Sequence, residues 1–393
     1  MSTLIQFVSD QIWPNLIGPL VINMPNEVIL FHTSDKHFIS SCEKIERTLI
    51  HLGIPKEKIL RAQIESDFPD KSTMLKSLIC HTKDKSDIIV NLTGGTKIMS
   101  IAGYAFSEKS KYPSFYIDTQ NPPYVYSFET GREIKLENWH EVTSRFNVET
   151  GLMAHSNSSP DLKHKTPENE KVYFSELTYK LFNQTDFRKN HGIFCDKLRN
   201  QFRPKKLLSG GKLRDALDKN IPNWEEMNPD WIDAGIKARL FHKEKEDLYL
   251  LHQDHSLFSS DKLKSTTENI LNLIEGSWYE LVLWKNLLNS KKYTEVRWSI
   301  EDNNNQEFGE NDLIAFNKAE LRLEFFSCKT GLSHIHPKEH IQALRNTANQ
   351  YGGKFSKPHL AVLRCKDDRQ LDSLKKKCRE FNVGLIQGLE PCL

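Results

Sequence analysis

Residues 88–99 read Ile-Ile-Val-Asn-Leu-Thr-Gly-Gly-Thr-Lys-Ile-Met, and this stretch decides the fold of the N-terminal part of the 393-residue chain. Its first three residues form a continuous apolar run, which is typical of a strand buried on both faces of a parallel sheet. The two glycines predict a tight turn, and a helix rich in small residues follows Lys97. The stretch therefore predicts one strand–loop–helix unit of an α/β domain.

Similar units lie on both sides of this stretch. Val28–Phe31 is a second buried strand, followed by apolar residues at helical spacing, and Phe115–Ile117 is a third strand. Strands that alternate with helices predict a Rossmann-like parallel sheet over residues 1–150. In such sheets, ligands bind beyond the C-terminal ends of the strands. The residues expected there are Thr33, Ser34, Thr93 to Lys97, and Asp118.

Composition excludes several classes of protein. The 54 Lys and Arg residues nearly balance the 52 Asp and Glu residues, so net charge indicates no partner. No apolar run approaches the about 20 residues of a membrane-spanning helix, and the N-terminus lacks the features of a secretory signal. The seven cysteines are scattered and form no CxxC motif, which is typical of reduced thiols. We therefore expect a cytoplasmic protein without a membrane contact.

The loop Thr93-Gly-Gly-Thr-Lys97 has the chemistry of an anion cradle. Two glycines permit close backbone approach, and the following helix offers unpaired N–H groups at its N-terminus. Two hydroxyls and one ammonium complete the cradle. The spacing is neither that of a P-loop nor GxGxxG. An ordinary tight turn followed by a solvated lysine remains the alternative.

Two motifs resemble a known family. Asn91–Met99 is similar to the signature of CARF domains, the CRISPR-associated Rossmann-like sensors of type III systems, and Val8–Asn15 resembles the N-terminus of CARF proteins fused to a nuclease. The resemblance implies a homodimer that binds a cyclic oligoadenylate, most often the tetra-adenylate, across its CARF interface. Asp118 either accepts a hydrogen bond from a ribose hydroxyl or caps a turn. The implied ligand contacts are Gln11, Asn15, Thr33, Ser34, Thr93, Gly94, Gly95, Thr96, Lys97 and Asp118.

A second constellation lies in the last part of the chain. Asp312 begins one predicted strand and Lys329 ends the next, while Glu280 lies in a preceding apolar helix. A carboxylate facing a lysine across a hairpin suits a metal-dependent phosphodiesterase, in which the metal activates water and the lysine stabilises developing phosphate charge. A surface ion pair is the alternative.

This region resembles the PD-(D/E)XK nuclease fold as it occurs C-terminal to CARF domains. The matching motifs are Gly276-Ser-Trp-Tyr-Glu280, Glu310-Asn-Asp312, Phe326-Ser-Cys-Lys-Thr-Gly331 and Tyr351-Gly-Gly353. The resemblance implies a C-terminal restriction-endonuclease-like α/β domain. It also implies that Glu280 and Asp312 bind Mg²⁺ or Mn²⁺. The implied catalytic residues are Glu280, Asp312, Ser327 and Lys329.

Ser327 departs from the family pattern, which has a carboxylate two residues before the lysine. In one interpretation the site works, with Glu310 or a migrated carboxylate such as Glu339 helping to hold the ion through water. In the other, the chain is an oligoadenylate sensor or regulator with a degenerate, non-cleaving nuclease domain. We favour a nuclease, activated by cyclic oligoadenylate, that cleaves RNA, DNA or both without sequence preference in antiviral defence. The RxxxxH spacing of another CARF-linked ribonuclease occurs only as near misses.

The chain between these regions reads as short helices. We divide the sequence into a CARF sensor at 1–150, a linker and mostly helical segment at 151–265, and a nuclease-like domain at 266–393. The middle segment has a basic run, Lys197 to Arg214, without an acidic residue. Such a run favours salt-dependent contact with nucleic acid, although a solvated loop is the alternative. The predicted nucleic-acid contacts are Arg203, Lys205 and Lys206. A weaker candidate metal site consists of His334, His336 and His340.

Overall fold

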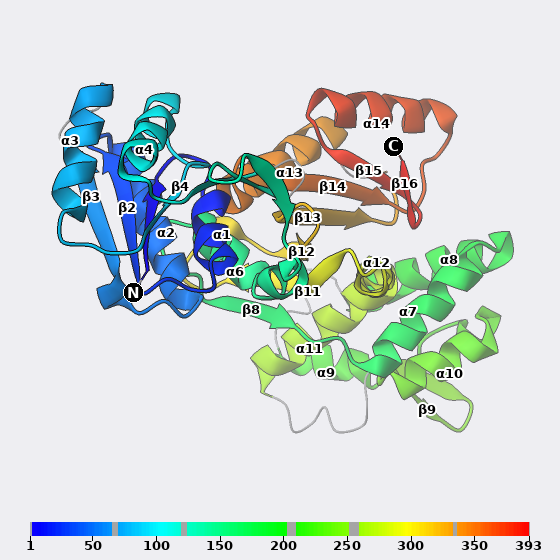
Figure 1. Ribbon diagram of the computed structural model, residues 1–393. Helices are drawn as coiled ribbons and strands as arrows, with labels where there is room; N and C mark the ends of the chain where they lie inside the picture. Colours follow the sequence, from blue (N-terminus) through cyan, green and yellow to red (C-terminus); the bar gives the residue numbers. More distant parts are fainter. Residues whose placement is uncertain are drawn as a thin grey trace.

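The computed structural model describes residues 2–64, 70–118, 124–202, 210–250, 259–332 and 336–392. Within these residues, the chain forms two seven-stranded sheets and one two-stranded sheet. The N-terminal sheet lies at one end of the molecule, the C-terminal sheet lies beside it, and the helical middle segment lies below the latter (Figure 1). The expected mixed α/β fold, with a Rossmann-like sheet, a helical middle and a second sheet domain, is confirmed.

The N-terminal sheet has the strand order β3-β2-β1-β4-β5-β6-β7. Neighbours from β3 to β5 pair in parallel, and the β5–β6 and β6–β7 pairs are antiparallel. The order reverses between β1 and β4, and this switch point is where α/β sheets bind ligands. The strands are β1 (Thr3–Phe7), β2 (Glu27–Thr33), β3 (Ile59–Ile64), β4 (Ile88–Asn91), β5 (Ser114–Ile117), β6 (Tyr124–Ser127) and β7 (Arg132–Lys135).

Helices cover both faces of this sheet. Leu4 and Leu30 pack with α1 and α2, whereas Ile5 and Phe31 pack with α3 and α4 on the other side. Adjacent strand residues point to opposite faces, so the continuous apolar runs supply both cores. The helices are α1 (Trp13–Val21), α2 (Lys36–His51), η1 (Lys56–Lys58), α3 (Lys71–Thr82) and α4 (Lys97–Ser110).

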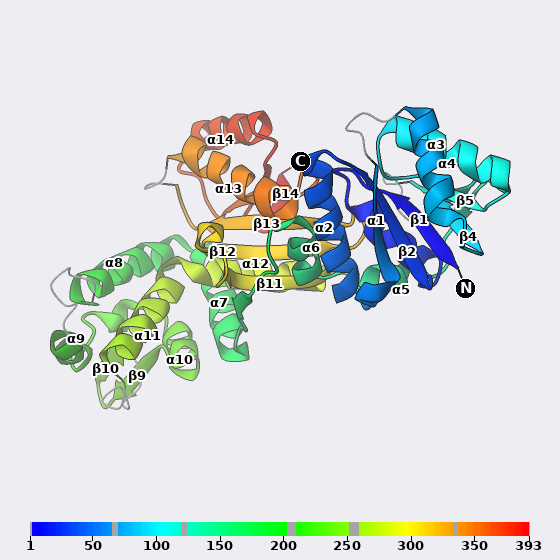
Figure 2. The ribbon, with the colours of Figure 1, turned by 90° about the vertical axis from the view of Figure 1, so that its left-hand side faces the viewer.

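A short helical connection joins the two sheet domains. It consists of α5 (Trp139–Ser144) and α6 (Val148–His155). The apolar core under α1 and α2 continues through Leu152 of this connection to Phe325 in the second sheet. The view in Figure 2 shows α6 between α2 and the C-terminal sheet. The two domains are therefore packed on one shared core rather than joined by a free linker.

The middle segment is mostly helical, as predicted. Trp231 is fully buried at the centre of its core. One part of the predicted 151–265 segment belongs elsewhere, because β8 (Leu162–Lys165) pairs with β11 at the edge of the C-terminal sheet. The other elements are α7 (Asn169–Phe182), α8 (Thr185–Phe202), α9 (Gly210–Leu217), η2 (Trp224–Glu226), α10 (Pro229–Lys237), β9 (Phe241–Glu244), β10 (Asp247–Leu250) and α11 (Ser260–Asn272).

The C-terminal sheet has the order β16-β15-β14-β13-β12-β11-β8. The β13–β14 and β14–β15 pairs are parallel, and the others are antiparallel. Helix α12 packs on one face, and α13 and α14 pack on the other. The elements are η4 (Leu273–Ser277), α12 (Trp278–Asn289), β11 (Tyr293–Asp302), η5 (Gln306–Phe308), β12 (Asn311–Asn317), β13 (Arg322–Lys329), α13 (Pro337–Gly352), β14 (Lys357–Val362), α14 (Asp368–Glu380), β15 (Gly384–Gln387) and β16 (Glu390–Cys392). Among the described residues, no helix is long and apolar enough to cross a membrane.

Candidate functional site

The loop after β4 is fixed by side chains inside the N-terminal domain. Asn91 donates from Nδ2 to Oε1 of Gln6 (3.0 Å), and its Oδ1 accepts hydrogen bonds from the backbone N–H and the hydroxyl of Thr93 (3.0 and 2.7 Å). The Thr93 hydroxyl in turn accepts from the N–H of Ile117 (2.7 Å). Thr93 therefore ties the loop to β5, which leaves its hydroxyl occupied by the protein itself.

The two glycines allow this loop to lie directly on the end of β1. A Cβ at Gly94 would be 2.1 Å from the carbonyl oxygen of Phe7. Gly95 has φ +80°, and a Cβ built there would be 2.5 Å from the Cβ of Phe7. Contacts below 3 Å do not occur between real atoms of this kind, so a side chain at either position would displace the loop.

Thr96 and Lys97 form the exposed side of the same loop. Thr96 is the N-cap of α4, with its hydroxyl accepting from the N–H of Met99 at 3.4 Å. Lys97 is exposed in the first turn of the helix. Its ammonium and the helix N-terminus both favour an anion at this edge.

Asn15 is the most informative of the other expected contacts. It is fully buried, its Nδ2 donates to the carbonyl of Phe7 at 3.0 Å, and its Oδ1 has no hydrogen-bond partner among the described residues. That oxygen faces Gly94, since a Cβ built there would lie 3.1 Å from it. A buried polar atom without a partner is costly, so this acceptor is suited to a hydrogen bond from a buried water at the switch point.

The remaining expected contacts differ in exposure. Gln11 is exposed, with its N–H donating to Ser9 Oγ at 3.2 Å, whereas Thr33 is fully buried at the end of β2. Ser34 and Asp118 are half-buried at the ends of β2 and β5. The structure thus places the expected residues at one end of the sheet, beyond the C-terminal ends of its parallel strands.

In the C-terminal domain, Asp312 and Lys329 lie next to each other on β12 and β13. Oδ2 of Asp312 accepts from the N–H of Cys328 (2.7 Å) and from the hydroxyl of Ser327 (3.1 Å). The ammonium of Lys329 is 3.7 Å from the same oxygen. The carboxylate is therefore held in place by the strand that carries the lysine.

Glu280 approaches this pair from α12. Its Oε2 accepts a hydrogen bond from Nε1 of Trp298 at 2.8 Å. Burial and the negative charge of Asp312 raise the pKa of Glu280 to about 8. Two carboxyl groups with one nearby ammonium leave excess negative potential, which a divalent cation offsets.

These oxygen donors fit a hard divalent cation such as Mg²⁺ or Mn²⁺, which takes one or two carboxylates and completes its shell with water and substrate phosphate. The described residues contain no group of three or more His, Cys, Asp or Glu placed to hold a metal. A cation would therefore rest on Glu280, Asp312 and water. Glu310 accepts from Ser299 and pairs with Lys165 (3.5 Å), and Glu339 is exposed on α13.

His340, which the sequence groups with His334 and His336 as a weaker candidate metal site, lies against Ser327. Its Nε2 lies 3.0 Å from the hydroxyl of Ser327, and burial and the charge of Lys329 lower the pKa of the ring. His334 lies outside the described residues, and His336 is the exposed N-cap of α13. The contact depends on how α13 packs against β13, which the spacing of the histidines does not reveal.

A cavity of about 930 Å³ opens in front of the carboxylates, between the C-terminal sheet and the middle segment. Glu280 and Asp312 are part of its lining, together with Glu168 and Glu310. Lys165, Lys171 and Arg239 also line it, and Lys165 pairs with Glu310 (3.5 Å) and Lys171 with Glu168 (2.8 Å). Cations in the lining of a cavity beside a carboxylate pair favour the approach of a phosphate backbone. Arg203, Lys205 and Lys206 lie outside the described residues.

Comparison with protein families identifies the N-terminal domain. Residues 3–148 match the family model of the Card1 CARF domain. The N-terminal domain is a CARF domain. The comparison with curated proteins found no match.

Solved structures share the fold over nearly the whole chain. Can2 from Sulfobacillus thermosulfidooxidans, in complex with cyclic tetra-adenylate, matches with a TM-score of 0.67 and 18% identity, covering 99% of this chain and 96% of its own. The protein VC1899 from Vibrio cholerae matches with a TM-score of 0.68 and 11% identity, covering 98% and 94%. A type III CRISPR defence DNA nuclease activated by cyclic oligoadenylate matches with a TM-score of 0.50 and 14% identity, covering 93% of this chain and 46% of its own.

Proposed function

We propose that the protein is a nuclease of type III CRISPR defence, activated by cyclic oligoadenylate and dependent on a divalent metal. The observation that carries the proposal is the cluster of Asp312, Lys329 and Glu280, whose two carboxyl groups line one cavity, in a chain whose N-terminal residues match a CARF domain. The structural similarity to Can2, which was solved with cyclic tetra-adenylate, supports this ligand class for the CARF domain.

The ligand site would use the edge formed by Asn15, Gly94 and Lys97. Backbone N–H groups and the Lys97 ammonium offer anion contacts, whereas the fully buried Asn15 holds the end of β1 through the Phe7 carbonyl. A cyclic oligoadenylate carries an anionic phosphate for each nucleotide. Two such cradles related by a two-fold axis would bind the ring symmetrically.

We propose a homodimer through α4 and the neighbouring strands, which would place two cradles in that arrangement. This surface of the CARF domain is exposed and apolar. The ring of Phe128 packs against those of Tyr104 and Tyr126, with centre-to-centre distances of 5.2 and 4.9 Å. The patch adjoins Lys97, so two copies joined here would bring their cradles together. Its exposed residues are Ile98, Ile101, Tyr104, Tyr116, Tyr126 and Phe128.

At the nuclease site, Glu280 and Asp312 would hold the metal. When bound, the metal supplies an activated water and polarises the scissile phosphate. Lys329 stabilises the charge that develops on the phosphate oxygens. Ser327 does not replace the missing carboxylate as an anion. Its hydroxyl orients Asp312 and is itself positioned by His340.

The contact between domains provides a route for activation. The Arg47 guanidinium on α2 donates to the carbonyls of Met153, Ser156 and Asn157 at the end of α6 (2.9, 2.5 and 3.1 Å). The ring of His155 on α6 fills the space beside Gly353, directly after α13. A shift of α2 would therefore move α13, whose first turns carry the partner of Ser327.

A sensor without nuclease activity is the second candidate. The observation that favours it is the absence of a third metal-binding side chain among the described residues at the Asp312 site, where Ser327 stands. In that case the CARF domain would bind its ligand and the C-terminal domain would bind nucleic acid without cutting it.

The discriminating experiment incubates the full chain with labelled RNA and supercoiled DNA in Mn²⁺, with and without cyclic tri-, tetra- and hexa-adenylate. Cutting that requires one of the rings supports the nuclease. Ligand-dependent binding of nucleic acid without cutting, in Mg²⁺ and Mn²⁺ alike, would favour the sensor.

A further inference from the structure

A second cavity, of about 710 Å³, lies in the C-terminal domain where β14 and β15 begin. It is lined by α12, the start of β11, and α14, together with Phe326 and His359 of the sheet. Its volume is within the range of pockets that bind small molecules.

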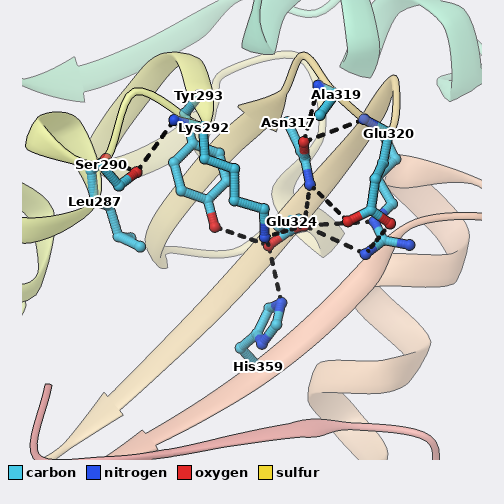
Figure 3. Close-up of polar contacts among 10 residues, drawn as sticks. Leu287, Ser290, Lys292, Tyr293, Asn317, Ala319, Glu320, Glu324 and His359 are labelled. Carbon is cyan, nitrogen blue, oxygen red and sulfur yellow. Dashed lines mark hydrogen bonds and ion pairs between the residues drawn. The ribbon is translucent and has the colours of Figure 1, made fainter. Parts of the chain in front are cut away.

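A buried carboxylate organises the residues around this cavity. Glu324 is fully buried and accepts hydrogen bonds from Tyr293 (3.0 Å), Asn317 (2.7 Å) and His359 (3.0 Å), and Lys292 pairs with it at 3.2 Å. Figure 3 shows these side chains converging on Glu324. Burial alone raises the pKa of Glu324, but the bonds from His359 and Asn317 and the nearby cations lower it well below its usual range. The carboxylate therefore stays charged and holds Lys292, Tyr293 and His359 in fixed positions.

The cavity is strongly cationic despite this carboxylate. Its lining contains Lys292, Lys357, Lys375 and Arg379, and none of the described lining residues is acidic. Lys375 has a partner at 3.9 Å in Asp372, but within the described residues Lys357 and Arg379 make no ion pair. Like charges around one cavity repel one another, and an anion between them relieves that repulsion.

The rest of the lining is apolar and aromatic. Leu287 and Leu389 contribute aliphatic surface, the Lys292 ammonium lies over the ring of Tyr293 at 5.2 Å from its centre, and Phe326 and His359 stack with their centres 4.7 Å apart. A cavity whose lining combines cations with apolar and aromatic surface matches a ligand with phosphates and a heterocyclic base.

We propose that this cavity binds a phosphorylated nucleotide, with its phosphates on Lys357, Lys375 and Arg379 and its base against Leu287 and Leu389. Glu324 has the role of a positioning residue, since it fixes the floor without facing the cavity. The site is separate from the nuclease centre, because Glu324 and Lys329 are five residues apart on β13, or about 17 Å along an extended strand. The proposal does not depend on cleavage.

The test is calorimetric titration of the full chain with ADP, adenosine and pyrophosphate in the absence of substrate. Lys357→Glu with Arg379→Glu reverses two exposed charges in the cavity. Lys376→Glu, on the outer face of the same helix, is the matched control, and Lys97→Glu reports binding at the CARF cradle. We expect ADP to bind about tenfold or more weakly in the double variant, because charge-assisted contacts are lost, and unchanged in Lys376→Glu.

Three results would overturn the proposal. The first is no ADP binding at about 1 mM, which is weaker than a formed nucleotide site allows. The second is binding that survives the double reversal or disappears in Lys97→Glu, which would place ADP in the CARF domain. The third is pyrophosphate binding as tightly as ADP, because the apolar walls would then contribute nothing. None of these results bears on the cleavage assays, so a failure of this proposal can be distinguished from a failure of the proposed nuclease function.

Discussion

The CARF loop and the Asp312 centre are built in opposite ways. In the CARF domain, five consecutive residues from Thr93 to Lys97 form the cradle, and glycine backbone lies on the end of β1. At the Asp312 centre, α12, β12, β13 and α13 each supply a side chain, and a neighbouring segment supplies the cavity wall. A backbone site is therefore sensitive to added volume, whereas a side-chain site is sensitive to lost charge. The predictions below test that difference.

The largest expected effect is on cleavage. Asp312→Ala removes the carboxylate to which Cys328 and Ser327 donate and near which Lys329 lies. We expect cleavage to fall by about 1000-fold or more, because the site would lose one of its two metal-binding carboxylates and the partner that positions Lys329. Affinity for cyclic tetra-adenylate should not change. Gel assays of cleavage and calorimetry of ligand binding measure the two. A variant that keeps its cleavage rate would place the nuclease centre elsewhere.

The next effect is on the cradle. Gly94→Val would push the loop away from Phe7, because even a Cβ would lie 2.1 Å from its carbonyl oxygen. We expect ligand affinity to fall by about 100-fold and stability to drop by ~1–3 kcal/mol through overpacking. Gly192→Ala is the control, because nothing lies within 4 Å of a Cβ there. Unchanged affinity in Gly94→Val would remove the loop from the ligand site.

A smaller effect tests the connection between the two regions. Arg47→Ala removes the contacts to three carbonyls at the end of α6, so stimulation of cleavage by the ligand should fall by about 3–10-fold, a coupling change of roughly 1 kcal/mol. Ligand affinity and unstimulated cleavage should stay close to wild type. The exposed Arg145, replaced by alanine, serves as the control. Full stimulation in Arg47→Ala would show that activation takes another route.

The smallest effect concerns stability and pH. Because the pKa of Glu280 is raised to about 8 in the folded protein, ionising this group destabilises the fold, and stability is lost as pH rises from about 4.5 to about 8. In EDTA at pH 8, Glu280→Gln should therefore melt roughly 1–3 °C above wild type, and the difference should vanish at pH 4.5. Mn²⁺ should raise the melting temperature of wild type more than that of the variant. Equal melting at both pH values would contradict the account of Glu280.

The same contrast explains which parts of the two sites could be predicted from the sequence. The CARF loop is contiguous, so its strand, turn and helix could be predicted from one short stretch. Asp312 and Lys329 could be paired because strand ends fix which residues face each other. The contact of His340 with Ser327 could not be predicted, because it depends on how α13 packs on the sheet.

Other features escaped prediction for a related reason. The Thr93 hydroxyl bonds to Asn91 and to the N–H of Ile117 on β5, and the second of these is a tertiary contact that the loop sequence does not indicate. The pairing of β8 with β11 joins residues more than a hundred positions apart, and it brings Lys165 to the cavity. Neither contact has a local sequence pattern. Contacts of this kind depend on long-range packing, which the motifs do not specify.

The most direct test of the central claim is cleavage of labelled single-stranded RNA and DNA by the wild-type chain and by Lys329→Ala, in Mn²⁺, with and without cyclic tetra-adenylate. The exposed-lysine variant Lys376→Ala is the matched control. The account predicts ligand-dependent cutting by wild type and Lys376→Ala, and none by Lys329→Ala, which should still bind the ligand. Undiminished cutting by Lys329→Ala, or wild-type cutting that ignores the ligand, would contradict it.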